Sequence, residues 1–411
     1  MIIRPYNPET DFEAVRRLWE EISWIDRDVK EDAGYLEKFL LNSNNLVAEL
    51  NNQAECLVSS GKGTIRHLEH TLNMQIIAAV TTSLVARKQK LASRTTARAI
   101  AEGAESGLPV SVLGMFEQGY YTRLGFGNGS YEQTVRFNPA LLNVESEFPV
   151  PVRLGADDYA ELHQALMNRW RSHGSVQVLS PENLHAELGW TRKPLGLGFR
   201  NENGELTHFI WGSCKDEHGP LQITAMAYQN RNQLLQLLSL IKSLGNQLYL
   251  VQLTETQHVQ LQDLLNEPFR SISKTKGSKY AEFFSSEAWW QLRINDLIAC
   301  MAATQLPARP TLAFNLSVHD PITQYLDDAQ GWRGIGGDYS IALGEQCSAQ
   351  RNHRSGLPLL EATASGISRL WLGTANANRL ATSGEIEADQ FLLDALDDTL
   401  NLPRPHPGWE F

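Results

Sequence analysis

Three cationic side chains stand directly before the expected start of a helix. Arg87, Lys88 and Lys90 precede the segment 91–106, whose apolar residues recur at helical spacing. The first backbone amides of a helix are unpaired and carry a partial positive charge, so they can hold a phosphate group. The pattern favours a phosphate site. A helix start with solvated lysines gives the same pattern, and taken alone that reading is the commoner one.

A second chemically interesting segment is Tyr120-Tyr121-Thr122-Arg123-Leu124-Gly125-Phe126-Gly127. A phenol, with a pKa near ~10, can give its proton to a departing anion, and such positioned transfer contributes typically ~10²–10⁴-fold to a rate. The alternative is that both tyrosines only pack in the core.

Other patterns indicate no chemistry. The segment Ser60-Gly61-Lys62-Gly63-Thr64 lacks the upstream glycine and the directly following Ser or Thr of a phosphate loop, so we predict a hairpin turn there. His67 and His70 have no third partner at metal-ligand spacing, and we expect both at the surface. We predict no metal site.

Composition narrows the class of protein. The 411 residues include 36 Lys and Arg against 47 Asp and Glu, a net charge of −11 that is a poor basis for binding nucleic acid. The four cysteines lie far apart, as in chains of a reducing compartment. The longest apolar run, residues 74–86, is interrupted by polar side chains and is too short to span a bilayer. With no signal-peptide pattern at its N-terminus, the chain is expected to be cytoplasmic, with neither membrane nor nucleic acid as partner.

The order of expected elements predicts three units. Strand and helix patterns alternate through residues 1–140, and a similar alternation recurs through 148–280, as if a fold were repeated. A linker rich in Ser, Lys and Gly, 271–279, leads to a third unit, 281–411. Three units agree with a prior of ~150 residues per domain.

Together these segments resemble the GCN5-related N-acetyltransferase (GNAT) fold. Arg87 to Ala92 is similar to the coenzyme A loop of that family, Arg/Gln-x-x-Gly-x-Gly/Ala, and Tyr121-x-Arg-Leu-Gly-Phe to its later tyrosine motif. The stretch 367–386, which begins Ile367-Ser-Arg-Leu-Trp-Leu-Gly-Thr, and the ending Trp409-Glu410-Phe411 extend the likeness to the enhanced intracellular survival (Eis) acetyltransferases. The resemblance implies an α+β chain with tandem GNAT-type domains, each a mixed central sheet flanked by helices. The first would be catalytic and the second degenerate, followed by an α/β domain similar to sterol carrier protein 2 (SCP2).

The resemblance also implies site residues. Tyr121 would be the general acid, and the terminal carboxylate of Phe411 the general base. Backbone amides around Leu84 to Ala86 would hold the thioester carbonyl, while Glu410 and Glu117 are acidic candidates for holding a cationic acceptor. The residues expected to bind acetyl-CoA are Leu84, Val85, Ala86, Arg87, Lys88, Gln89, Lys90, Leu91 and Ala92.

One residue of this chain differs from the family's coenzyme A loop, and the difference bears on two hypotheses about function. The family's loop usually carries glycine where this chain has Lys90, and glycine permits a close backbone approach and unusual angles. Lys90 therefore favours a binding protein with degenerate acetyltransferase units, whose third unit binds an apolar ligand. Tyr121, Arg87 and the ending at Phe411 favour an acetyl-CoA-dependent enzyme that transfers acetyl to a primary amine of an aminoglycoside, a polyamine or a lysine side chain. We prefer the enzyme, which by resemblance forms a homo-oligomer, a hexamer.

Overall fold

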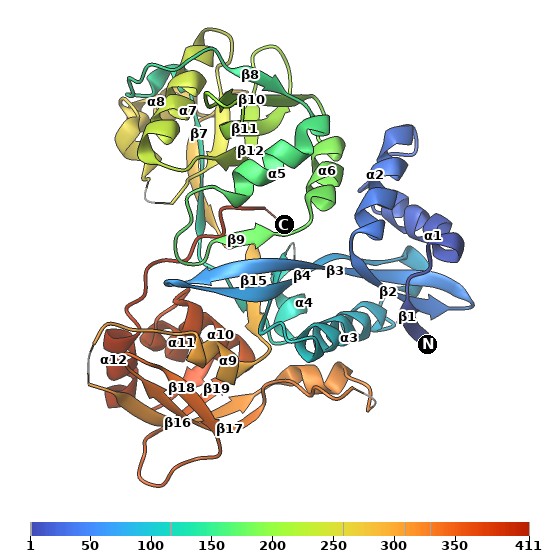
Figure 1. Ribbon diagram of the computed structural model, residues 1–411, viewed down its shortest axis with the longest axis vertical. Helices are drawn as coiled ribbons and strands as arrows, with labels where there is room; N and C mark the ends of the chain where they lie inside the picture. The colour runs from blue at the N-terminus through green and yellow to red at the C-terminus, as the bar shows by residue number, and fades with distance from the viewer. Residues whose placement is uncertain (1, 116, 258, 309, 329, 411) are drawn as a thin grey trace.

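Three β-sheets follow one another along the long axis of the molecule (Figure 1). The computed structural model describes residues 2–410 except 116, 258, 309 and 329. The first sheet lies in the middle, the second above it and the third below it in the view of Figure 1.

The first sheet is mixed, in the order β1-β2-β3-β4-β5-β15-β6, with β9 pairing on β3. Only β4 and β5 pair in parallel. Its elements from the N-terminal part of the chain are β1 (Ile2–Pro5), α1 (Pro8–Glu21), α2 (Lys30–Leu41), β2 (Asn44–Leu50), β3 (Gln53–His67), β4 (His70–Thr82), η1 (Leu84–Ala86), α3 (Leu91–Glu105), β5 (Val110–Gly114), α4 (Gln118–Thr122) and β6 (Gly127–Asn128). The predicted helix 91–106 is confirmed, and the strand β5 follows it at Val110–Gly114.

The second sheet repeats this arrangement in the order β14-β7-β13-β12-β11-β10-β8. Again a single parallel pair, β12 with β13, interrupts antiparallel neighbours. The elements are β7 (Glu132–Phe137), β8 (Val152–Leu154), α5 (Tyr159–Met167), α6 (Pro181–Trp190), β10 (Pro194–Arg200), β11 (Leu206–Cys214), β12 (Leu221–Ala227), α7 (Arg231–Ser243), β13 (Val251–Thr254), α8 (Pro268–Thr275) and β14 (Phe283–Glu287). The repeated mixed sheet gives the chain a tandem architecture.

The third sheet has the order β18-β17-β16-β19-β20. Its elements are α9 (Leu297–Ala302), β16 (Leu312–His319), η6 (Pro321–Tyr325), β17 (Gly337–Leu343), β18 (Ser348–Arg351), β19 (Leu359–Thr363), α10 (Ala364–Leu372), α11 (Ala377–Thr382), β20 (Ile386–Glu387) and α12 (Gln390–Thr399). One hydrophobic core runs from Met74 and Val112 of the first sheet to Leu316 and Leu396 of the third unit.

Strands cross between the units. The segment 131–137, expected to end the first unit, forms β7 inside the second sheet. Conversely, β9 (Val176–Val178) and β15 (Trp290–Ile294) leave later parts of the chain to join the first sheet. Local sequence predicts a strand, but its partner is chosen by long-range packing, so the sheets do not follow the expected boundaries.

Three smaller expectations are corrected. Residues 60–64 lie inside the long strand β3 rather than in a turn, because β9 pairs with them at Gly63 and Thr64. His67 is fully buried, stacked on Trp371 of the third unit with ring centroids 4.3 Å apart. Much of the expected linker 271–279 belongs to α8.

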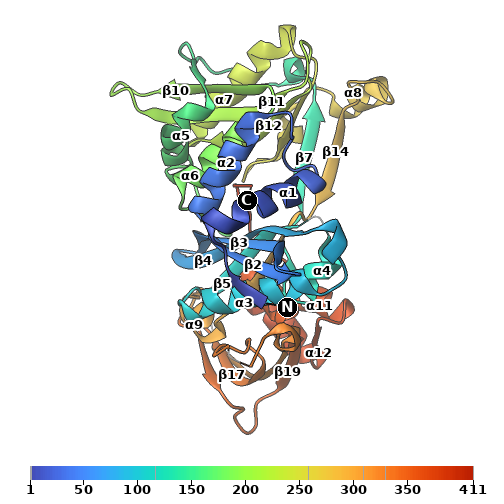
Figure 2. The same ribbon diagram turned by 90° about the vertical axis from the view of Figure 1, so that its right-hand side faces the viewer.

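The C-terminal tail, residues 402–410, runs from the third unit past the first sheet to the second unit (Figure 1). Its backbone is held there, since Val176 N donates to Pro407 O at 2.9 Å and His406 N donates to His173 O at 3.1 Å. From the other side, α2 packs on α6 (Figure 2), where Arg192 Nη1 donates to Asp32 Oδ1 at 2.9 Å. The first unit and the tail therefore both border the second unit.

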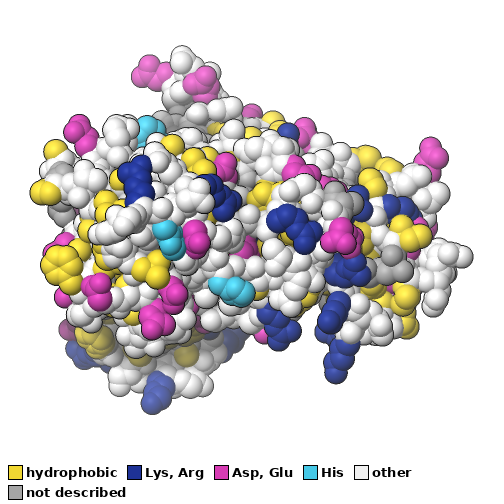
Figure 3. Space-filling view, turned by 90° about the horizontal axis from the view of Figure 1, so that it is seen from below, with side chains coloured by type: hydrophobic (Ala, Val, Ile, Leu, Met, Phe, Trp, Pro, Cys, Tyr) yellow, Lys and Arg dark blue, Asp and Glu magenta, His cyan; other side chains and the backbone are white. Residues whose placement is uncertain are grey.

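No helix in the described part of the chain is long and apolar enough to cross a membrane. On the face that Figure 3 shows, basic and acidic side chains are interspersed rather than gathered by sign.

Candidate active site

Strands β4 and β5 separate at the centre of the first sheet. Their parallel pairing covers only Met74–Ile76 against Val110–Val112. Farther along β4, the register with β3 shifts, and Ala79 has a φ of +52°. A bulge of this kind bends a strand and leaves backbone groups without ladder partners. The opening between the two strands is therefore built into β4.

Helix α3 is fixed over this opening by one buried side chain. Gln75 Nε2 donates to Ala99 O at 2.8 Å, and Ser111 Oγ donates to Gln75 Oε1 at 3.0 Å. Gly103 makes room for that side chain, because a Cβ there would lie 2.3 Å from Gln75 Oε1. The N-terminus of α3 thus has a defined position beside β4.

The loop before α3 has the backbone conformation that a coenzyme A loop with glycine at this position would need. Lys88 and Lys90 have φ values of +64° and +61°, in the left-handed region that glycine enters freely and other residues enter at a cost of ~1–2 kcal/mol. Both lysine side chains are exposed, and Lys90 gives α3 no side-chain cap. The lysine at the glycine position therefore leaves the loop conformation open to a phosphate group.

The amides around Leu84 to Ala86, expected to hold the thioester carbonyl, have partners inside the protein at two of their three positions. These residues form a 3₁₀ turn in which Leu84 N donates to Glu21 Oε2 at 3.1 Å and Ala86 N donates to Ser83 O at 3.2 Å. Two of the three amides are therefore already used inside the protein.

Tyr121 lies on α4 and is 5% exposed. Its ring packs edge-on against Tyr120, with centroids 4.8 Å apart, and against Phe126. Burial, together with the neighbouring Tyr120 and Glu117, raises the pKa of the Tyr121 phenol above its ordinary value. The phenol therefore keeps its proton at neutral pH.

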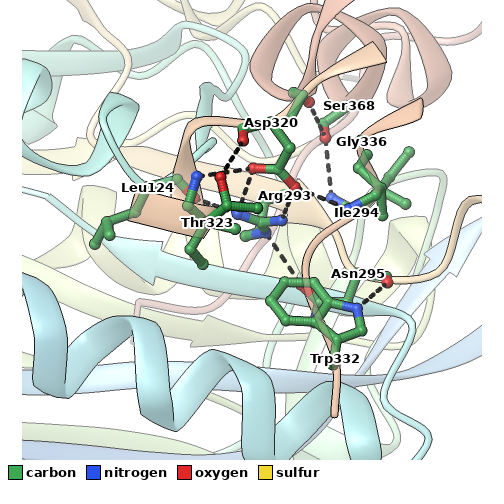
Figure 4. Close-up of polar contacts among 12 residues, drawn as sticks. Leu124, Arg293, Ile294, Asn295, Asp320, Thr323, Trp332, Gly336 and Ser368 are labelled. Atoms are coloured by element: carbon green, nitrogen blue, oxygen red, sulfur yellow. Dashed lines mark hydrogen bonds and ion pairs between the residues drawn. The ribbon is translucent and has the colours of Figure 1, made fainter. Parts of the chain in front are cut away.

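The turn after Tyr121 is tied to the third unit. Arg293 on β15 donates to Leu124 O, and its Nη2 lies 2.7 Å from Asp320 Oδ2 (Figure 4). Gly125, with a φ of +82°, fits here because a Cβ would lie 2.7 Å from Arg293 Nη1. Trp332 covers the guanidinium, with the ring centroid 5.1 Å from Cζ. The backbone after α4 is thus anchored through Arg293.

The tail closes a cavity of about 660 Å³ in the second unit. Trp409 packs there against Arg169, whose Cζ lies 5.3 Å from the ring centroid, and Arg169 donates to Pro407 O at 3.0 Å. The five tryptophans in the wall are Trp170, Trp190, Trp211, Trp289 and Trp409. One of these tryptophans, Trp289, lies next to the first sheet, because Met115 N donates to the carbonyl oxygen of Trp289 at 2.7 Å.

Two carboxyl groups in this wall are electrostatically perturbed. Burial raises the pKa of Glu187 to about 8, with a further contribution from the nearby Glu410 carboxyl. Burial also raises the pKa of Glu410. Both residues are solvent-exposed and line the cavity. Such groups gain most from a cationic ligand, which would restore their charged form.

Comparison with known proteins identifies the first unit. Residues 3–129 match the acetyltransferase (GNAT) domain model. Residues 3–129 therefore form a GNAT acetyltransferase domain, which supports an acyltransferase.

Solved structures share the whole architecture. A probable N-acyltransferase from Enterococcus faecalis has 15% identity and a TM-score of 0.80, covering 100% of this chain and 99% of that one. A GCN5-related N-acetyltransferase from Anabaena variabilis has 14% identity and a TM-score of 0.77, and Eis1 from Mycobacterium abscessus has 13% and 0.76, each covering 100% of both chains. At such identities the likeness concerns the fold alone. No curated protein sequence matches significantly.

The structure distributes the residues expected from sequence over two regions. Tyr121 and the loop residues Ala86 and Leu91 share one hydrophobic cluster of the GNAT domain. Trp409 and Glu410 border the cavity of the second unit, and Glu117 is the exposed N-cap residue of α4. Phe411 lies outside the described residues.

Sequence reasoning missed Glu187, the tryptophans and the anchoring pair Arg293 and Asp320. No motif surrounds Glu187. Its place in the cavity wall beside Glu410 depends on the C-terminal tail, which is distant from it in the sequence. Arg293 offered a weak signal, as a charged residue within the apolar strand pattern Trp290–Ile294.

Proposed function

We propose that this protein is an acetyl-CoA-dependent N-acetyltransferase that acts on a primary amine of a cationic acceptor by direct attack. The observation that carries the proposal is the loop before α3, where Lys88 and Lys90 take glycine-like backbone angles beside an uncapped helix start in a GNAT domain. That conformation supports the enzyme over a degenerate binding protein, for which Lys90 was the main argument.

The residues present fit the cofactor's phosphates. The segment 84–92 would hold them, with Arg87, Lys88 and Lys90 supplying charge and the first amides of α3 supplying donors. When bound, acetyl-CoA supplies an acetyl thioester. In this proposal, backbone amides of β4 beyond its pairing with β5 donate to the carbonyl oxygen of that thioester.

The cavity closed by the tail suits an amine. Glu187 and Glu410 provide carboxyl groups, and the tryptophan faces in the wall attract ammonium groups. Aminoglycosides, polyamines and lysine side chains all carry such groups.

Two proton movements complete the reaction. The amine nitrogen forms a bond to the acetyl carbon while the carbon–sulfur bond breaks. Tyr121, protonated because its pKa is raised, donates to the departing thiolate. The amine's proton goes to a carboxylate, and we assign this base to the terminal carboxylate of Phe411, which follows Trp409 and Glu410 in the sequence.

We further propose that the chain is Eis-like. Its domains would be the expected units 1–140, 148–280 and 281–411, except that β7, β9 and β15 pair in the sheet of another unit. The third unit would be SCP2-like. The full-length structural likeness to Eis1 supports this placement. A cytoplasmic homo-oligomer, a hexamer, belongs to the same proposal.

The first test is isothermal titration of acetyl-CoA into the protein, followed by thiol release in the presence of spermidine, kanamycin or a lysine peptide. We expect saturable binding at one site per chain and amine-dependent release of thiol. Binding without thiol release with any amine would contradict the enzyme. No binding at millimolar acetyl-CoA would contradict the whole proposal.

A further inference from the structure

A second cavity adjoins the one that the tail closes. It has a volume of about 530 Å³. The residues that line both cavities are Glu132, Trp170, Glu255, Thr256, Gln257 and His406. Because the walls are shared, one extended molecule could reach both spaces.

The acidic side chains of the shared wall already have partners. Glu132 Oε2 lies 3.0 Å from His406 Nε2, and Glu132 Oε1 accepts from Ser130 Oγ at 3.3 Å. Glu255 Oε1 accepts from Leu261 N at 2.7 Å. These groups therefore serve the protein's own structure.

The carboxyl groups of the first cavity are different. Among the described residues, neither Glu187 nor Glu410 has an ion-pair partner within 4.0 Å. The first cavity therefore offers two carboxyl groups that can pair with an ammonium group, while Arg169 in the same wall donates to backbone carbonyls.

The second cavity offers an unmatched positive charge. Arg66 pairs with Glu69 at 2.8 Å, but Arg171 has no acidic partner among the residues that the structure describes. Arg171 Nη2 reaches only Thr64 Oγ1 and Ser175 O, each at 3.4 Å, and its Nε is buried without a hydrogen-bond partner. Burial, and next the nearby Arg66, lower the pKa of Arg171.

We propose that the acceptor is a primary amine that also carries an anionic group, with its ammonium beside Glu187 and Glu410 and its carboxylate or phosphate against Arg171. The proposal rests on the proposed function and narrows its acceptor class. A partly buried guanidinium gains strongly from a charged acceptor oxygen, since such hydrogen bonds are roughly twice as strong as neutral ones. A simple polyamine carries no anionic group, so it would give Arg171 no acidic partner.

The test compares acceptors that differ only in the anion. Acetyl transfer is measured for ε-aminocaproate against hexylamine, γ-aminobutyrate against butylamine, and phosphoethanolamine against ethanolamine. The first two pairs report a carboxylate and the third a phosphate. Each pair is measured with the parent protein, Arg171→Gln, Arg171→Lys and the control Arg153→Gln, which replaces an exposed arginine on β8 outside both cavities.

We expect higher kcat/KM for the anionic member of at least one pair, and a loss of about tenfold to a hundredfold for that member in Arg171→Gln, the range for hydrogen bonds to charged groups. The neutral member should be unaffected. Arg171→Lys should recover part of the loss, and Arg153→Gln should match the parent. Equal rates within every pair, or an equal loss for both members in Arg171→Gln, would overturn the proposal.

A binding measurement separates this proposal from the proposed function. The same anionic amines are titrated into the protein without acetyl-CoA. Arg171-dependent binding with no acetyl transfer would preserve the two-charge site and reject the enzyme. Acetyl transfer to polyamines alone would preserve the enzyme and reject the two-charge site.

Discussion

Arg293 and Asp320 form an ion pair that is completely buried between the first sheet and the third unit. Arg293 Nη2 lies 2.7 Å from Asp320 Oδ2, and both side chains are 0% exposed. Asp320 also accepts from Ile335 N at 2.9 Å and Ile322 N at 3.2 Å. Because Arg293 also binds Leu124 O, the pair connects the third unit to the turn that follows Tyr121.

Replacing Asp320 with Asn should destabilise the protein and slow the reaction. Removing one partner leaves a buried charge uncompensated, which costs ~3–5 kcal/mol. We expect that loss in urea unfolding, and a lower kcat at unchanged acetyl-CoA affinity, because the turn after Tyr121 loses its anchor. The control Glu13→Gln breaks the exposed pair with Arg16 and should cost less than about 1 kcal/mol. Normal stability of Asp320→Asn would contradict the structural role.

Lys90→Gly should stabilise the fold or leave it unchanged and preserve acetyl-CoA binding. Glycine removes the cost of a left-handed lysine, ~1–2 kcal/mol, against its own entropic cost of ~0.5–1 kcal/mol. Gln89→Gly, next to it but without a positive φ, should only destabilise. Opposite signs in thermal unfolding would confirm the backbone at Lys90, while equal losses in both variants would contradict it.

Tyr121→Phe should retain acetyl-CoA affinity and lose turnover, by up to ~10²–10⁴-fold, because the acid for the departing thiolate is gone. Tyr120→Phe is the matched control. Its hydroxyl accepts from Ser93 Oγ at 3.4 Å, and burial raises the pKa of Tyr120 to about 12. Steady-state kinetics of both variants, with titration of acetyl-CoA, provide the measurement. Unchanged turnover in Tyr121→Phe would remove Tyr121 from the acid role.

The buried His67 should make the junction of the three units sensitive to acid. Burial, and next the neighbouring His173, lower the pKa of His67 to about 3. His67 Nε2 lies 3.1 Å from Trp371 O, and His173 Nε2 lies 2.9 Å from Leu372 O. Below the ordinary histidine pKa of ~6.5, His67 binds a proton in the unfolded chain but stays neutral in the folded chain. The free energy of unfolding therefore falls as pH drops from about 6.5 toward 3.

The measurement is urea unfolding at several pH values, comparing the parent with His67→Phe. Phenylalanine can keep the stack on Trp371 but cannot titrate. The parent should lose roughly 2 kcal/mol more than the variant between pH 8 and pH 5, since each pKa unit corresponds to ~1.4 kcal/mol. Parallel pH profiles for the two proteins would contradict the buried, neutral histidine.

Glu187→Gln should weaken binding of the amine acceptor and change its pH dependence. Because the pKa of Glu187 is raised to about 8, its charge is complete only above that pH, so acceptor binding should tighten as pH rises toward 8. The glutamine variant should lose this rise while acetyl-CoA binding stays the same. KM for the amine across pH provides the test. Glu182→Gln, on the same helix but outside both cavities, is the control.

Sequence alone predicted what depends on neighbouring residues. The helix Leu91–Glu105 and the alternation of strands and helices repeated in the second unit follow from periodicity. The loop at Arg87 to Lys90 and the segment around Tyr121 were found from residue type and spacing.

Only the tertiary structure decided which distant segments meet. It placed the strand Glu132–Phe137 in the second sheet, buried His67 against Trp371, and brought Glu187 beside Glu410. Nothing in a local pattern distinguishes these outcomes, because strand partners, burial and carboxyl pKa values are set by packing between residues far apart in the chain. For the same physical reason, only the folded protein shows that Arg171 has no acidic partner among the described residues.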